Sequence, residues 1–276
     1  MDLLATNPLI VTAHAPANAR LPVSVDNPSG EPFRGRLVLQ GQQTDGWKLL
    51  AKTRLELKDG QTHTLLLVSA GAPDALAGPL RLCVADDDGR QHCQTDGLRL
   101  VVVDDFARYT AETLAEAYQV VPDGDAKVAS SQSLAPAEPK AGPPLPGAAC
   151  LRVRYEMAKG WKFVRLAPRR DELRTIEGKP KQFALWLHGD GSGHSPRLRF
   201  RDTTGQTFQP AAEPIRWKGW KCALFPMDGR HVGHWGGAND GIVHYPISWD
   251  TLLLIDKDRD QAGKGEVYVA SPTLMY

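Results

Sequence analysis

The chain has 276 residues, and its 33 lysines and arginines almost balance 32 aspartates and glutamates, so its formal net charge is +1 at pH 7. That balance, with no basic run, gives the molecule no overall field that would attract a polyanion, and we expect no nucleic acid partner. The length predicts two domains, and the longest apolar runs, such as residues 64–68, have strand length and fall short of a membrane span, so we expect no membrane partner.

The first hundred residues carry short apolar stretches separated by turn signals. Strands are expected at residues 9–13, 21–25, 35–39, 48–57, 62–68, 80–85 and 98–103. Breakers such as Asn27-Pro28-Ser29-Gly30, Asp45-Gly46 and Gly71-Ala72-Pro73 stand between them. Because many short strands occur without a long helical pattern, an immunoglobulin-like β-sandwich is predicted over residues 1–103.

Two cysteines flank a predicted tight hairpin in this sandwich. Asp87-Asp88-Gly89 fits a three-residue loop, and if Asp86 pairs with Arg90, then Cys83 lies opposite Cys93. That pair would be of the closer, non-hydrogen-bonded kind, so a cross-strand disulfide and two buried free thiols both remain open. Cys150 and Cys222 have no comparable local argument.

The segment after residue 103 begins a second predicted domain, residues 104–276. A weak helical period over residues 104–121 predicts a short helix, with Thr110 as its N-cap. Residues 122–147 are rich in Pro, Ala, Ser and Gly and predict a long surface excursion within this domain.

The rest of the chain alternates strands and turns. Strands are expected at residues 150–157, 162–166, 183–188, 197–201, 221–225, 251–255 and 266–270. With no strand–helix–strand alternation, an all-β antiparallel domain is predicted. Its centre is residues 183–208, FALWLHGDGSGHSPRLRFRDTTGQTF, where a glycine-rich turn joins two half-buried strands and a second turn, residues 202–205, closes the next hairpin.

This central stretch resembles a known family. The W-x-x-GDGSG pattern from Trp186 to Gly193 resembles the central hairpin of galactose-binding-like β-jelly rolls, especially carbohydrate-binding modules of family 11. Asp104-Asp105-Phe106 is similar to the opening DDF of that family. Residues 234–241, HWGGANDG, look like a late loop, and residues 265–269, GEVYV, look like the closing strand.

The resemblance implies a function for the second domain. It implies a non-catalytic region that binds a polysaccharide or oligosaccharide and accompanies a catalytic domain in a longer glycan-degrading enzyme. Residues 1–17 lack a basic leader followed by an apolar core and do not read as a secretory signal. Either the protein is cytoplasmic or the chain is a piece of a longer protein. Because the resemblance points to secreted multidomain enzymes, we expect a piece of a longer extracellular or periplasmic protein.

Candidate binding residues follow from strand parity. Sugar sites need flat aromatic rings for the axial C–H groups of a pyranose, with polar groups beside them. If Phe183, Leu185 and Leu187 face the core, Trp186 and His188 face outward. The same parity sends outward the residues Arg152, Arg154 and Glu156 in one strand and Arg197, Arg199 and Arg201 in another. The predicted ligand-binding residues are therefore Trp186, His188, Trp235, Arg199 and Arg154. For each arginine taken alone, an ordinary solvated strand face is the favoured explanation.

A structural calcium ion is a second expectation, which the resemblance implies. Asp104 or Asp105 would supply hard oxygen ligands where the opening and closing strands meet. The closing strand here continues into Ser271 and Pro272 where the family has an acidic residue, which weakens that prediction. Asp256, Asp258 and Asp260 imitate the start of an EF-hand loop, but Gln261 stands where its glycine belongs.

Two alternatives to carbohydrate binding remain open. A jelly-roll polysaccharide lyase or hydrolase could use His188, Arg199 and either Tyr155 or Tyr245 as acid–base groups, although Tyr155 shares a face with apolar residues. The turn GDGSG is no nucleophile elbow, because its serine is misplaced. His231, His234 and His244 lie near Asp240 in sequence without the spacing of a zinc site. A pair of structural spacer domains without ligand is the second alternative.

Overall fold

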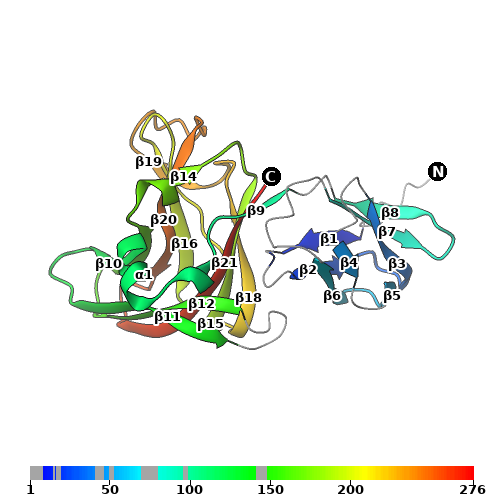
Figure 1. The fold of residues 1–276 in the computed structure, drawn as a ribbon, viewed down its shortest axis with the longest axis horizontal. Helices are drawn as coiled ribbons and strands as arrows, with labels where there is room; N and C mark the ends of the chain where they lie inside the picture. The colour runs from blue at the N-terminus through cyan, green and yellow to red at the C-terminus, as the bar shows by residue number, and fades with distance from the viewer. Residues whose placement is uncertain are drawn as a thin grey trace. The chain divides into compact units, whose positions relative to one another are not determined.

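The computed structural model describes residues 9–14, 16, 20–40, 47–49, 53–69, 80–95, 99–140 and 148–276. The fold is all-β, as predicted, with antiparallel sheets throughout the described residues. The chain divides into two compact units, Met1–Val102 and Val103–Tyr276, which Figure 1 shows in blue to cyan and green to red. The predicted turns Asp45-Gly46 and Gly71-Ala72-Pro73 lie outside the described residues. No described helix is long and apolar enough to cross a membrane.

Two sheets build the first unit. Their strands are β1 (Ile10–Ala13), β2 (Arg20–Asp26), β3 (Phe33–Gln40), β4 (Trp47–Leu49), β5 (Arg54–Leu57), β6 (Thr62–Ser69), β7 (Arg81–Asp86) and β8 (Gln91–Gln94), and β9 (Leu100–Val102) follows them in the chain without belonging to either sheet. One sheet has the order β1-β2-β6-β4 and the other β5-β3-β7-β8. The predicted strand at residues 48–57 is two strands that belong to different sheets. Alternate residues such as Leu65 and Leu67 are buried, as a half-buried strand requires.

The β7–β8 hairpin corrects the predicted cysteine register. The Asp86 N–H donates to the Arg90 carbonyl at 3.0 Å, so the turn forms as expected. A β-bulge then shifts the pairing, and Cys83 lies opposite Gln94 while Cys93 lies opposite Val84. The direct Cys83–Cys93 pairing is therefore wrong, because one extra residue in β8 changes every later partner. Both cysteines are free thiols.

The second unit is a sandwich of two sheets. Its elements are η3 (Phe106–Arg108), α1 (Ala111–Ala117), β10 (Tyr118–Gly124), β11 (Ser130–Lys140), β12 (Ala148–Met157), β13 (Lys162–Pro168), η4 (Asp171–Leu173), β14 (Thr175–Ile176), β15 (Gln182–Asp190), β16 (Ser195–Arg201), β17 (Thr207–Gln209), β18 (Lys218–Pro226), β19 (Gly233–Trp235), β20 (Ile247–Asp256) and β21 (Gly263–Met275). The Trp235 sheet, as we name it, has the order β10-β13-β20-β16-β17-β19. The Tyr155 sheet has the order β11-β12-β21-β15-β18. Because the chain crosses repeatedly between the sheets, this is a β-jelly roll.

Aromatic side chains fill the space between the two sheets. Phe183 of the Tyr155 sheet packs on Trp249 of the Trp235 sheet with ring centroids 4.7 Å apart. Phe200 and Phe208 stack at 5.0 Å on adjacent strands. These rings are almost fully buried, and Trp249 is therefore a core residue.

The predicted helix forms with its predicted cap. The Thr110 side chain accepts from the Thr113 N–H and the Thr113 hydroxyl accepts from the Thr110 N–H, a reciprocal capping box. Of the surface excursion predicted for residues 122–147, the described part, residues 122–140, is largely strand in β10 and β11, and residues 141–147 lie outside the described residues. Both are edge strands, with a neighbouring strand on one side only. Pro122 and Pro136 lack a backbone N–H, and an edge strand tolerates this because it has no second neighbour to bond.

The glycine-rich turn forms between β15 and β16 as expected. Gly191 and Gly193 have positive φ, at 77° and 75°. The Asp190 carboxylate accepts the Ser192 N–H at 2.9 Å. Gly189 serves a different purpose, since a Cβ there would lie 2.6 Å from the Trp217 carbonyl. The turn thus needs glycine both for backbone conformation and for close packing.

Candidate functional site

An aromatic cavity of about 330 Å³ opens on the Trp235 sheet. Trp161 and Trp235 line it, and they are 50% and 44% exposed although both are large apolar side chains. The Trp161 ring lies 6.1 Å from the Phe163 ring. The Arg199 guanidinium lies over Phe163 at 5.0 Å and over Trp235 at 5.3 Å. These four side chains form a contiguous set, which we call the aromatic row.

Strand geometry brings the aromatic row together. Trp161 directly precedes β13, Phe163 lies within β13, and Trp235 ends the edge strand β19. In β16, Leu198 and Phe200 are buried in the core, so Arg199 between them points to the opposite face. A sheet thus places three segments far apart in sequence on one surface.

Arg199 is held from several sides. Its Nε donates to Gln209 Oε1 at 2.6 Å and its Nη1 donates to Asp123 Oδ2 at 3.3 Å. Its side chain is 15% exposed, and this burial lowers the pKa of the guanidinium, while Asp123 opposes the change. An arginine remains charged under such conditions, so the cavity has a rigid cationic wall.

A band of ion pairs continues from Arg199 across the sheet. Asp123 Oδ2 also pairs with Arg165 Nε at 3.1 Å. Asp250 pairs with Arg165 at 3.3 Å and with Arg201 at 3.0 Å. These paired charges immobilise the strand face beside the aromatic row.

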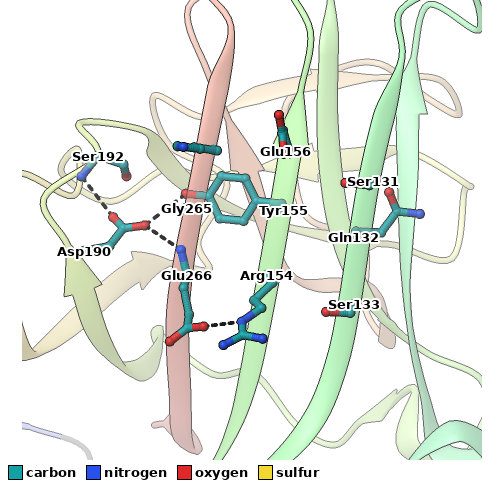
Figure 2. A pocket seen from close by; sticks show the side chains of 11 residues that line it. Ser131, Gln132, Ser133, Arg154, Tyr155, Glu156, Asp190, Ser192, Gly265 and Glu266 are labelled. Atoms are coloured by element: carbon teal, nitrogen blue, oxygen red, sulfur yellow. Dashed lines mark hydrogen bonds and ion pairs between the residues drawn. The ribbon is translucent and has the colours of Figure 1, made fainter.

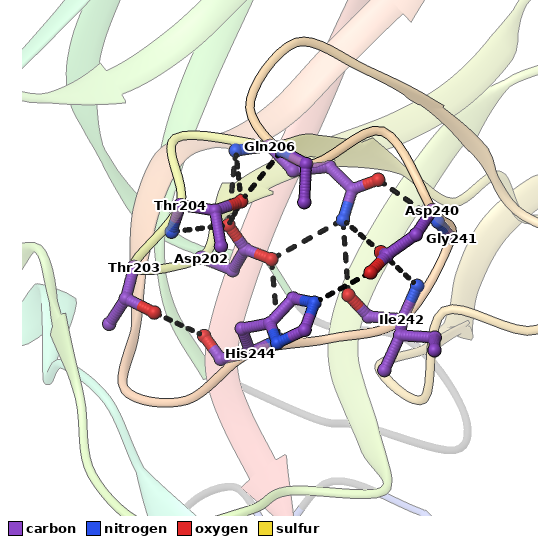
Figure 3. A network of polar contacts seen from close by, with 9 residues as sticks. Asp202, Thr203, Thr204, Gln206, Asp240, Gly241, Ile242 and His244 are labelled. Carbon is purple, nitrogen blue, oxygen red and sulfur yellow. Dashed lines mark hydrogen bonds and ion pairs between the residues drawn. The ribbon is translucent and has the colours of Figure 1, made fainter.

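A buried polar network fixes the loop that follows Trp235 (Figure 3). Gln206 is fully buried, and its Nε2 donates to Asp202 Oδ2 at 3.3 Å, Asp240 Oδ1 at 3.2 Å and the Ile242 carbonyl at 3.0 Å. Its Oε1 accepts the Gly241 N–H at 3.0 Å. One amide therefore joins the β16–β17 turn to the loop, and buried amides satisfied in this way specify a single arrangement.

Of the histidines that cluster in sequence, His244 belongs to this network and His234 does not. His244 Nε2 donates to Asp240 Oδ2 at 2.9 Å. The Ile242 N–H, and then His244, lower the pKa of Asp240 to about 2. His234 instead directs its Nδ1 to the Val232 carbonyl. Within the described part of the chain, no three His, Cys, Asp or Glu side chains form a group able to hold a metal ion.

A larger groove, about 690 Å³, lies on the Tyr155 sheet (Figure 2). Arg154 forms an ion pair with Glu266 on the neighbouring strand. The Tyr155 hydroxyl lies 2.8 Å from His194 Nδ1, and Asp190 Oδ2 accepts the Glu266 N–H at 2.9 Å. Tyr155 is only 3% exposed, so its ring offers no stacking surface in this groove.

Trp186 is not the surface platform that the sequence predicted. Its parity is opposite to Phe183, Leu185 and Leu187, as expected, but it is 1% exposed, because β15 is buried on both faces. Its neighbour on that face, His188, is half-buried and packs edge-on against Trp220 at 5.4 Å. Strand parity therefore does not predict exposure where both faces of a strand are buried.

The structure unites two predicted ligand residues and separates the others. Trp235 and Arg199 meet in the aromatic row, whereas Arg154 and His188 lie on the other sheet. The acid–base set proposed for a lyase is divided in the same way, since Arg199 lies on one sheet and Tyr155 on the other. Tyr245 lies apart from both, with the Lys179 ammonium over its ring at 5.4 Å.

The residues predicted to bind calcium are engaged by protein groups. Asp104 is buried, accepts the hydroxyls of Tyr109 at 2.7 Å and Tyr118 at 2.6 Å, and pairs with Arg108 at 2.8 Å. Asp105 accepts the Ala107 N–H and caps η3. A guanidinium in contact with Asp104 disfavours a cation at the same carboxylate, so these residues do not fit a calcium site.

Sequence reasoning did not select Trp161, Phe163, Gln209 or Arg259, which line the cavity. The Arg259 guanidinium lies 5.6 Å from the Trp161 ring. Phe163 belongs to an ordinary strand pattern. The turn signal Lys159-Gly160 before Trp161 could have marked an exposed ring, in the way that the glycines did for Trp235.

Comparisons with known proteins find similar solved structures but no matching sequence family. No family model matches the chain, and no curated protein matches it. The solved family 11 carbohydrate-binding module of cellulosomal cellulase Lic26A-Cel5E of Clostridium thermocellum is similar at a TM-score of 0.42 and 10% identity, over 63% of this chain and 93% of that chain. A family 11 module of the same organism, in complex with a β-1,3-1,4-mixed-linked tetrasaccharide, is similar at a TM-score of 0.41 and 11% identity, over 63% of this chain and 94% of that chain.

Proposed function

We propose that the second unit binds a polysaccharide along the aromatic row of the Trp235 sheet. One observation carries this proposal: two half-exposed indole rings, Trp161 and Trp235, line a single cavity with a buried cation and a ring between them. Large exposed rings are unfavourable in water unless a partner covers them. A pyranose presents a flat face of C–H groups that suits such a ring.

Polar groups beside the rings would read the sugar hydroxyls. Arg199 and Gln209 are hydrogen-bonded to each other and line the same cavity as the tryptophans. A small number of fixed donors and acceptors in an apolar setting is the usual arrangement of a small-molecule or glycan subsite. The arrangement therefore supplies stacking for affinity and hydrogen bonds for selectivity.

The site is also rigid before ligand arrives. The Gln206 network fixes the loop after Trp235, and Arg199 is hydrogen-bonded on two sides. Rigid side chains lose little conformational entropy on binding, so weak individual contacts can still give measurable affinity.

This binding would serve an accessory role without bond cleavage. In a longer extracellular or periplasmic enzyme, a binding unit raises the local concentration of polysaccharide at a tethered catalytic domain. The first unit, with its two packed sheets, would then act as an immunoglobulin-like connector.

Affinity electrophoresis against a panel of neutral, uronic and sulfated polysaccharides tests the proposal. Trp161→Ala and Trp235→Ala should each weaken retention by about tenfold, because each removes one stacking ring. Ile242→Ala is the control, since Ile242 is 61% exposed and does not line the cavity. The incubated polymer is also assayed for new reducing or unsaturated ends, and we expect none.

The proposal fails if both tryptophan variants are retained like the unmodified chain. Urea unfolding of each variant checks the fold, and we expect little change because both rings are half exposed. New chain ends in the polymer would favour the lyase or hydrolase alternative instead.

A further inference from the structure

The charges that line the aromatic cavity are unbalanced. Three arginines, Arg197, Arg199 and Arg259, line it against one carboxylate, Asp256. The nearby acids Asp258 and Asp260 belong to the same turn as Arg259 but do not line the cavity. The whole chain carries a formal charge of only +1, so this positive excess is local.

The other groove of the same unit provides an internal comparison. Its charged lining residues are Arg154 and Lys264 against Glu156, Asp190 and Glu266. If cations were in excess on the strand faces in general, the excess would appear both in the aromatic cavity and in the groove on the Tyr155 sheet. Of these two places, the cavity with the exposed tryptophans has the excess and the other groove does not.

The carboxylates on the Trp235 sheet are already shared among the arginines. Asp123 pairs with both Arg165 and Arg199, while Asp256 pairs with Arg197 at 3.4 Å. For Arg259, the described residues provide an indole partner and no carboxylate within ion-pair distance. Arg259 is therefore a cation of the cavity with no carboxylate partner among the described residues, and Arg199 shares its partner Asp123 with Arg165.

Each exposed indole has a guanidinium against its ring. Arg259 lies over Trp161 and Arg199 lies over Trp235, and both rings still keep about half of their surface exposed. A sugar stacked on the exposed part of either ring would carry its substituents close to a planar fork of N–H donors. Carboxylates and sulfates are the groups that such a fork binds best.

From this arrangement we infer that the ligand is an anionic polysaccharide, with carboxylate or sulfate groups on rings that stack on Trp161 and Trp235. The inference rests on the proposed function and specifies the chemical class of its ligand. The stacking selects a sugar ring, and the excess of arginines over carboxylates in the cavity selects its negative charge.

Four polymers separate the possibilities in affinity electrophoresis at low and high salt. They are polygalacturonate, the same polymer with its carboxyl groups reduced to alcohols, a sulfated galactan, and poly-L-glutamate. We expect polygalacturonate or the sulfated galactan to bind at least about tenfold more tightly than the carboxyl-reduced polymer. High salt should reduce that difference. Whichever anionic polymer binds more tightly identifies carboxylate or sulfate as the recognised group.

Arg259→Gln tests the inference within the protein. It should weaken binding of the anionic polymer about tenfold and leave binding of the carboxyl-reduced polymer unchanged. Arg154→Gln is the matched control, because it removes the same charge from the opposite sheet. Arg259 is exposed, and circular dichroism verifies that both variants keep the fold.

Different outcomes overturn different claims. If neither polygalacturonate nor the sulfated galactan binds more tightly than the carboxyl-reduced polymer, the anionic class is refuted and polysaccharide binding is left intact. Equal binding of poly-L-glutamate, or an equal loss in Arg154→Gln, refutes recognition at the cavity and indicates general ion exchange. If no polysaccharide in the whole panel is retained, the proposed function fails and the inference fails with it.

Discussion

The Arg199 guanidinium lies over the Trp235 indole at 5.3 Å, joining a residue of a central strand to one at the sheet edge. Thirty-six positions separate them in the chain, from 199 to 235. This contact connects the ion-pair band of the Trp235 sheet to the exposed ring that we propose binds sugar. Because ion pairs and hydrogen bonds hold Arg199 in place, its contact also restricts the movement of the Trp235 indole.

Replacing Arg199 should therefore affect both stability and binding. In Arg199→Met, the contacts with Asp123 and with two aromatic rings are lost, and we expect the free energy of unfolding to fall by about 2 kcal/mol. Polysaccharide retention should fall as in Trp235→Ala. The control Arg201→Met lies on the same strand with its side chain 57% exposed, and should cost below about 0.5 kcal/mol. Urea unfolding checks both values, and equal losses in the two variants would contradict this account.

Gly237 should tolerate no side chain. Its φ is +52°, and a Cβ would lie 2.3 Å from the Gln206 N and 2.6 Å from Thr204 Oγ1. Gly237→Ala should destabilise the chain by roughly 2 kcal/mol or more and weaken polysaccharide retention, because the loop after Trp235 has to move. Gly233→Ala is a close control, since a Cβ there meets nothing within 4 Å. Unfolding and retention assays compare the pair, and a neutral Gly237→Ala would show that the network does not position Trp235.

His194 should make stability depend on pH near neutrality. Burial lowers the pKa of this histidine from its usual 6.5, with Asp190 opposing the change. As pH falls below 6.5, the unfolded chain gains a proton that the folded chain binds less readily, so the free energy of unfolding decreases. The contribution is complete above pH 6.5 and is lost as pH falls through the folded pKa.

Urea unfolding between about pH 8 and about pH 5 measures this effect. His194→Gln should unfold with a smaller decrease across that range than the unmodified chain. His231→Asn, in an exposed loop, should keep the original dependence. If His194→Gln retains the full decrease, another group is responsible.

The thiol of Cys93 should react slowly in the folded chain. Burial raises its pKa to about 11 from the usual 9.0. The thiolate is the reactive species, so at about pH 8 the fraction available falls roughly a hundredfold. Iodoacetamide labelling followed by mass spectrometry should show slow modification in buffer and fast modification in urea. Equal rates in the two conditions would contradict the burial of this thiol.

Local chemistry explains what could be predicted along the chain. Strands such as β15, β16 and β20 were found from apolar alternation or apolar runs, because a sheet buries one or both of its faces. The turns at Gly191 and Gly205 were found because positive φ favours glycine. The Thr110 cap was likewise local, since its partners are three residues away.

Three predictions failed because a neighbouring strand or a covering segment determines the conformation, register or exposure of the residue. Pro136 reads as a loop residue, but an edge position lets it remain in β11. Because of a bulge in β8, Cys93 pairs with Val84 and not with Cys83 as predicted. Trp186 has outward parity, but both faces of β15 are buried. The edge position of a strand, its bulges and the covering of its faces all depend on segments distant in sequence. The hydrophobic periodicity of one segment contains no information about them.

The sequence by itself determined the all-β class, most strand positions, the central turns and the outward parity of Arg199. Those features depend on the alternation of side chains within one strand or on the backbone conformation of single residues. Only the tertiary structure decided that Trp161, Arg199 and Trp235 line one cavity and that Arg154 lies elsewhere. Contacts between strands depend on sheet order and register, and these follow from the packing of the whole core rather than from any short segment.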